Sequence, residues 1–153
     1  MCGKMTDLIS RSINAASNLI SEGRFDESEA VCRQILVVNE SNPIAMRLLS
    51  CCLDRLGKFE ESKKTLAEAE RMAEGKAEVH NAMGIACMHA RETASAMEHF
   101  GISAEIDQEA EDPRFNTASC LMMLGKPKEA LAAFREAYSR SGSHKSIIGM
   151  ACA

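Results

Sequence analysis

Gly57-Lys58-Phe59 is the middle one of three stretches in which Gly is followed by a basic residue and then by Phe or Pro. Gly23-Arg24-Phe25 lies 34 residues before it, and Gly125-Lys126-Pro127 lies two periods of 34 residues after it. Gly at such a place fits a left-handed residue that ends one helix, and Pro127 fits the first turn of the next helix. A constant period without insertion or deletion predicts a stacked array of repeated helical units.

The residues between these turns repeat with the same period. A small residue lies five positions after each turn Gly, at Ser28, Ser62 and Ala130, and Ala96 holds the same place in the third copy. A second small column precedes the turn and consists of Ala16, Ser50, Gly84 and Ala118. Apolar residues recur three and four positions apart around both columns, so each period predicts two helices. In the third copy we expect helices at residues 77–90 and 94–107, with Thr93 as the N-cap of the second.

Arg91 occupies the Gly column of the third copy. A residue with a Cβ atom resists the left-handed conformation that Gly adopts readily. We therefore expect this turn to be either strained or of a different shape.

The columns resemble those of the tetratricopeptide repeat (TPR) family over roughly residues 6–144. The apolar-plus-small pair of the family's first helix corresponds to Ala15-Ala16, Leu49-Ser50, Met83-Gly84 and Thr117-Ala118. The resemblance implies an all-α, right-handed α-solenoid of four helix-turn-helix repeats in a single domain, residues 1–153. The implied repeats are at about residues 9–42, 43–76, 77–110 and 111–144, followed by a partial fifth or capping helix at residues 145–153.

The composition excludes several classes of function. Apolar residues make up 46% and charged residues 26% of the 153 residues, which is typical of a folded protein. With a net charge of -4 and no basic run longer than Lys63-Lys64, the chain lacks the charge pattern of a nucleic-acid-binding protein. The apolar runs are too short for a membrane span, and the N-terminus lacks the apolar stretch of a signal peptide, so we expect a cytoplasmic protein.

We expect neither an enzyme nor a cofactor or metal site. The sequence has no Gly-rich phosphate loop, no His-Glu-x-x-His motif and no nucleophile elbow. His80 and His89 are nine residues apart and would lie on opposite faces of one helix, so they cannot share a metal ion. The seven cysteines include no Cys-x-x-Cys pair, and most fall in apolar columns, where a reduced thiol behaves as a small apolar side chain.

TPR proteins are, as a family, binding scaffolds whose first helices line a concave groove, and the resemblance implies such a groove here. The matching positions are apolar and rich in Met in the C-terminal half, which is typical of an adaptable recognition surface. We therefore predict a protein or peptide partner that presents an extended or helical segment with apolar anchor residues. The predicted groove residues are Arg47, Arg55, Asn81, Ile85, Met88, His89, Phe115, Asn116, Met122 and Met123.

Several alternatives concern the partner and the extent of the chain. The carboxylate clamp of TPR co-chaperones is missing. Where it needs Lys and Asn, the first repeat has Ile13 and Ser17, and the second repeat has Arg47 and Cys51. Residues 112–130 resemble the last repeat of TPR chaperones of type III secretion, which implies an apolar translocator segment as ligand. Residues 144–153 are in register with a fifth repeat and could cap the array or support self-association. The chain could also be the TPR region that precedes a transferase domain in a longer enzyme.

Overall fold

The computed structural model describes residues 2–141 and 150–151, and over these residues it contains α-helices and no strand. The predicted all-α class is therefore confirmed. None of these helices is both long and apolar enough to cross a lipid bilayer. The helices of the described residues are α1 (Cys2–Ser21), α2 (Phe25–Val38), α3 (Pro43–Arg55), α4 (Phe59–Ala73), α5 (Ala77–His89), α6 (Thr93–Ile106), α7 (Asp112–Met123) and α8 (Pro127–Ser141).

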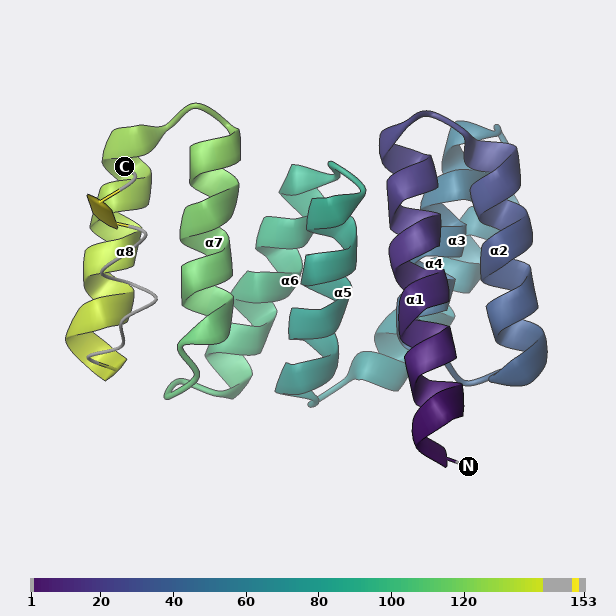
Figure 1. Ribbon diagram of the computed structural model, residues 1–153, viewed down its shortest axis with the longest axis horizontal. Coiled ribbons are helices and arrows are strands. Elements are labelled where there is room, and N and C mark those ends of the chain that lie inside the picture. The colour runs from purple at the N-terminus through teal and green to yellow at the C-terminus, as the bar shows by residue number, and fades with distance from the viewer. Residues whose placement is uncertain (1, 142–149, 152–153) are drawn as a thin grey trace. The chain divides into compact units, whose positions relative to one another are not determined.

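The contacts divide the chain into two compact units, which we describe separately. Unit 1 comprises Met1–Glu74 and His89–Arg91, and unit 2 comprises Gly75–Met88 and Glu92–Ala153. Within unit 1, α1 packs on α2, α3 packs on α4, and α3 also contacts α1 and α2. Within unit 2, α7 packs on α8 and on α6. Figure 1 shows the paired helices as antiparallel hairpins.

The predicted terminal helix at residues 145–153 falls largely outside the described residues. Met150 and Ala151 are its described part, and both are helical. Met150 packs on the buried cluster of Ala118, Ala130 and Phe134 in unit 2. Self-association through residues 144–153 and the single domain over residues 1–153 stay predictions.

The Gly turns end a helix in the left-handed conformation, as predicted. The φ angle is 76° at Gly23, 77° at Gly57 and 69° at Gly125. In each turn the amide that follows Gly donates a hydrogen bond to the carbonyl oxygen five residues earlier, for example from Lys58 to Leu53 at 2.8 Å. This bond is typical of the Schellman motif, which satisfies carbonyl groups that the end of a helix leaves unpaired.

Arg91 adopts the same left-handed conformation as the Gly residues, with a φ angle of 62°. The amide of Glu92 donates to the carbonyl oxygen of Cys87 at 2.9 Å, which is the same bond as in the Gly turns. The third turn therefore keeps the common shape, and of the two alternatives the strained backbone is correct. The prediction of Thr93 as N-cap is wrong, because this turn closes at Glu92 and α6 already begins with Thr93.

Within each of the first two hairpins, the two small columns face each other. Ser28 Oγ donates to the carbonyl oxygen of Ala16 at 2.9 Å, and Ser62 Oγ donates to that of Ser50 at 2.8 Å. A hydroxyl on one helix reaches the backbone of the other only where the two helices lie close together. Because interiors are close-packed, larger residues in these columns would force the helices apart.

Gly84 holds the same place in the third hairpin, where the ring of Phe100 lies against it. A Cβ atom built on Gly84 would lie 2.5 Å from Phe100 Cε1 and 2.6 Å from Phe100 Cδ1. Phe100 is fully buried, so its ring cannot move aside without displacing its neighbours. The absence of a side chain at Gly84 thus makes room for the largest side chain of this core.

A buried carboxylate links the two hairpins of unit 1. Glu29 of α2 accepts hydrogen bonds from Lys58 Nζ at 2.9 Å and from Arg33 Nη2 at 2.8 Å. Arg33 Nη2 also bonds to Glu61 of α4 at 2.7 Å. The bonds from Lys58 and then from Arg33 lower the pKa of Glu29 from its ordinary value, although burial acts in the opposite direction. The basic residue of the second turn therefore also connects neighbouring repeats.

We predict that Gly84→Ala lowers the free energy of unfolding by about 1–3 kcal/mol, because the new methyl group overlaps the Phe100 ring. Chemical denaturation measures the change. Gly101→Ala is the matched control, since Gly101 is also helical but has no atom within 4 Å of an added Cβ atom. This control is expected to be neutral or to stabilise by up to about 1 kcal/mol. Equal effects of the two substitutions would contradict the close contact at Gly84.

We predict that Arg91→Gly raises the free energy of unfolding by about 1 kcal/mol, because Gly adopts the left-handed conformation without steric conflict. Arg91→Ala keeps the Cβ atom and should give no such gain, so it separates backbone strain from loss of the Arg side chain. Gly125→Ala should lower the free energy of unfolding by about 1 kcal/mol, since it introduces the same strain. Thermal and urea unfolding of the three variants test this, and equal gains from Arg91→Gly and Arg91→Ala would refute the strain.

Candidate protein-binding site

Two amide side chains connect the first helices of the two hairpins in unit 2. Asn116 Nδ2 of α7 donates to Asn81 Oδ1 of α5 at 3.1 Å, and both residues are half-buried. The two residues are one period plus one residue apart, so Asn116 lies one position after Phe115, the repeat counterpart of Asn81. The structure thus brings these two predicted groove residues together.

The predicted apolar residues of α5 are half-buried rather than fully exposed. Ile85 and Met88 pack on the buried cluster that contains Cys87 and Phe100. Each of these side chains therefore contributes to the core on one side and to the surface on the other.

The predicted apolar residues of α7 also lie partly in the core and partly at the surface. Phe115 and Met122 are half-buried and pack on the cluster around Phe134. The rings of Phe115 and Phe134 have centroids 5.3 Å apart and planes 56° apart, a geometry typical of a favourable aromatic pair. Met123 is 50% exposed and is the most accessible apolar residue of this predicted set.

We call the combined surface the α5–α7 face, which consists of Asn81, Ile85, Met88, Phe115, Asn116, Met122 and Met123.

The remaining predicted groove residues belong to unit 1. Arg47 Nη1 of α3 donates to Ser50 Oγ at 3.3 Å. The guanidinium carbon of Arg55 lies 5.8 Å from the centroid of the Phe25 ring, within the range of a cation–π contact. His89 is the exposed last residue of α5 and is grouped with unit 1. Both arginines thus have structural contacts on or next to their own helix.

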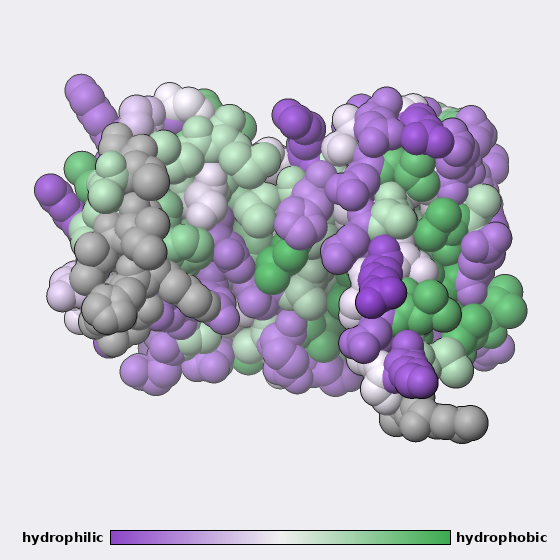
Figure 2. Space-filling view, viewed as in Figure 1, coloured by the Kyte–Doolittle hydropathy of each residue, from purple (hydrophilic) through white to green (hydrophobic). Residues whose placement is uncertain are grey.

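An apolar cleft between α1 and α2 has no counterpart among the sequence predictions. Its volume is about 300 Å³, and Met5 and Leu8 on one side and Val38 on the other are more than half exposed. Figure 2 shows apolar side chains at the surface over these two helices. A signal existed in the sequence, because apolar residues at helical spacing begin at Met5, before the first predicted repeat. The lining residues are Met5, Leu8, Ile9, Ser12, Val31, Gln34, Ile35 and Val38.

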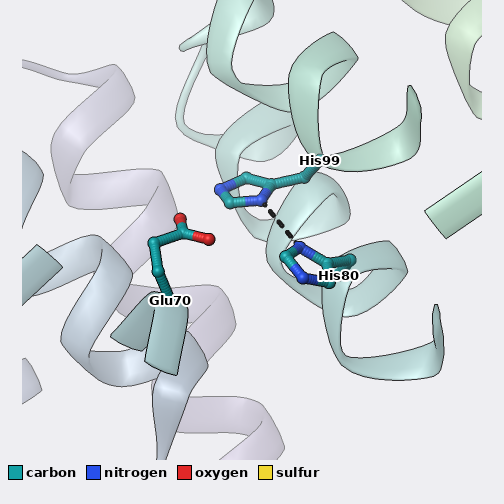
Figure 3. Close-up of side chains that lie close together, drawn as sticks. All are labelled: Glu70, His80 and His99. Atoms are coloured by element: carbon teal, nitrogen blue, oxygen red, sulfur yellow. Dashed lines mark hydrogen bonds between the residues drawn. The ribbon is translucent and has the colours of Figure 1, made fainter. Parts of the chain in front are cut away.

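His80 of α5 and His99 of α6 face each other inside unit 2, as Figure 3 shows. Their Nδ1 atoms are 3.3 Å apart, their ring centroids are 5.6 Å apart, and both residues are buried. Figure 3 also draws Glu70, which belongs to unit 1. From the sequence, we compared His80 only with His89 of the same helix. That comparison missed this pair because His99 lies on the second helix of the hairpin.

A simple spacing rule would identify the pair from the sequence. Cross-hairpin contacts join residues that are 12 apart (Ser28 and Ala16), 19 apart (His80 and His99) and 26 apart (Ser103 and Ala77). The separations increase by seven residues from one contact to the next. Each contact lies one helical turn farther from the loop that joins the helices, and one turn takes about 3.6 residues on each of the two helices. Residue types that recur at these separations are therefore candidates for direct contact.

Buried thiols account for five of the cysteines, and the predicted apolar role of these five is confirmed. They are Cys32, Cys51, Cys52, Cys87 and Cys120. Burial, followed by the nearby Cys87 thiol, raises the pKa of Cys120 to about 11. The contact with Cys52, followed by burial, also raises the pKa of Cys32. At neutral pH these two side chains are protonated thiols, which are poor nucleophiles.

Solved structures of known proteins resemble the chain over most of its length. PilF of Pseudomonas aeruginosa matches with a TM-score of 0.52 and 14% identity over 97% of this chain and 68% of PilF. MamA matches with a TM-score of 0.54 and 14% identity over 88% of this chain and 79% of MamA. YrrB, described as a TPR protein with an unusual peptide-binding site, matches with a TM-score of 0.51 and 18% identity over 97% of this chain and 80% of YrrB. This chain has the TPR fold.

No protein-family model and no curated protein match the chain, so its TPR assignment rests on the three-dimensional comparison together with the period of the sequence. In the TPR fold, α1, α3, α5 and α7 are the first helices of the repeats. The α5–α7 face is therefore formed by the first helices of the third and fourth TPR repeats.

Proposed function

We propose that this TPR protein is a non-catalytic scaffold that binds a peptide or helix of a partner protein on the α5–α7 face. The observation that carries the proposal is the Asn81–Asn116 hydrogen bond, which joins two successive first helices among partly exposed apolar side chains. A surface with a few fixed polar groups among apolar ones is typical of binding sites in proteins. The Met side chains add an adaptable, polarisable component.

The amide pair has the chemistry to recognise a peptide backbone. The bond between the two side chains uses the Asn116 amino group as donor and the Asn81 oxygen as acceptor. The amino group of Asn81 and the oxygen of Asn116 do not take part in that bond. These two groups are a donor and an acceptor, the same pair of functions that one peptide unit offers. An extended segment can therefore bond to the pair while its side chains contact Met88, Phe115 or Met123.

The comparison with YrrB supports this class of function, since that TPR protein is described by its peptide-binding site. We assign no reaction to the chain, because the sequence has no catalytic motif and the five described free thiols are buried. A chaperone for apolar segments would use the same surface, and its ligand would differ only in being more apolar.

We predict that Met123→Glu weakens the binding of a peptide selected on the wild-type protein by at least roughly tenfold, because contact with an apolar anchor would desolvate the new carboxylate. The peptide comes from a displayed random library, and fluorescence anisotropy gives the Kd. Ile106→Glu is the matched control, since Ile106 is a similarly exposed apolar residue at 42% but lies at the end of α6. This control should change the Kd by less than about twofold, as distant surface changes usually do.

Asn116→Asp tests the polar part of the same face, because the carboxylate cannot donate to Asn81. We expect weaker peptide binding with little change in melting temperature. Met88 and Met122 are less suitable for charge substitution, since both contact buried clusters and their loss would lower stability. Unchanged affinity in both Met123→Glu and Asn116→Asp would refute the α5–α7 face as the binding site.

A further inference from the structure

His80 and His99 hold two imidazole nitrogens at the separation that a tetrahedral metal ion requires. A Zn–N bond is about 2.0–2.1 Å long, so two such bonds at a tetrahedral angle place their nitrogen atoms about 3.3–3.4 Å apart. The Nδ1 atoms of the pair are 3.3 Å apart. We propose that His80 and His99 form a binding site for a divalent transition-metal ion such as Zn²⁺, with Nδ1 of each ring as ligand.

The orientation of the rings supports this assignment. The ring centroids are 5.6 Å apart, whereas the Nδ1 atoms are only 3.3 Å apart, so the two rings approach by their nitrogen-bearing edges and not by their faces. The lone pair of an unprotonated imidazole nitrogen lies in the plane of its ring and points away from that edge. Figure 3 shows the two Nδ1 atoms turned toward each other. The two Nδ1 positions are thus directed into the same region.

The hairpin fixes this geometry on both sides of the pair. One turn farther from the hairpin turn, Ser103 Oγ donates to the carbonyl oxygen of Ala77 at 2.7 Å. On α5, Gly84 lies one turn nearer to it than His80 and is in close contact with Phe100, the residue that follows His99 on α6. His80 and His99 are 4% and 3% exposed, so packing restricts their rotamers. Ligands held by packing and neighbouring hydrogen bonds are the ones that bind metal ions with little reorganisation.

The chemistry of the pair sets the class of ion. In the hydrogen-bonded pair, one Nδ1 carries a hydrogen and donates it to the other. When an ion binds both Nδ1 atoms, that hydrogen moves to Nε2 of the same ring, and both rings remain neutral ligands. The two imidazoles supply two of the four ligands of a tetrahedral ion. Imidazole favours Cu²⁺, Ni²⁺ and Zn²⁺, whereas Mg²⁺ prefers oxygen, so Mg²⁺ should not bind.

The test uses the full chain and simple salts of the ions. We expect ZnCl₂ to raise the melting temperature of the wild-type protein and MgCl₂ to leave it unchanged. Isothermal titration with Zn²⁺ should show at least tenfold weaker binding for His80→Gln and for His99→Gln. His89→Gln is the matched control, because it removes an exposed histidine from the end of α5 and should leave Zn²⁺ binding intact. Zn²⁺ bound only to thiols would survive all three substitutions and would overturn the proposal.

A second measurement needs no substitution, in case the buried histidines are required for folding. Nitrogen-15 NMR of the wild-type imidazole rings should show Zn²⁺-dependent shifts at Nδ1 of His80 and His99 and none at His89. An absence of shifts at the first two rings would mean that the pair is a hydrogen bond only. Because the pair is separate from the α5–α7 face, this result does not depend on the proposed peptide binding.

Discussion

The close approach of the two helices in each hairpin is the constraint on which the other features of this protein depend. It requires small residues at facing positions, and the hydroxyl-to-carbonyl bonds of Ser28 and Ser62 are possible only at that distance. Gly84 extends the principle, because the missing side chain admits the Phe100 ring. In all four hairpins of the described residues, a turn residue with positive φ connects the two helices. These turn residues are Gly23, Gly57, Arg91 and Gly125.

The same constraint determines which side chains meet farther along the hairpin. Contacts recur at separations of 12, 19 and 26 residues, so the histidine pair follows from the register of α5 and α6. The small residues lie on the face of the first helix that is turned toward its partner helix. The other faces of the first helix carry different side chains. In unit 2 these include the Asn81–Asn116 pair. The helix packing within the hairpins and the histidine pair thus share one repeated spacing.

The sequence was sufficient for the period, the paired helices and the left-handed turns, because each depends on local residue types that recur every 34 residues. The state of the Arg91 turn needed coordinates, since a side chain at that position is compatible with either strain or a different shape. The pairing of His80 with His99 was missed because it depends on the register between helices. The division of Met88 and Met122 between core and surface depends on neighbours from other helices, which helical periodicity alone does not give. The α1–α2 cleft was missed because α1 begins before the first repeat.

The central claim is that the α5–α7 face is the surface that binds a partner segment. Amide and side-chain NMR shifts, recorded while a library-selected peptide is titrated into the full chain, test it most directly. The account predicts that the largest shifts arise from the side-chain amides of Asn81 and Asn116 and from the backbone around Ile85 and Met123. Shifts gathered instead at Met5, Leu8 and Val38 would place binding in the α1–α2 cleft and contradict the account.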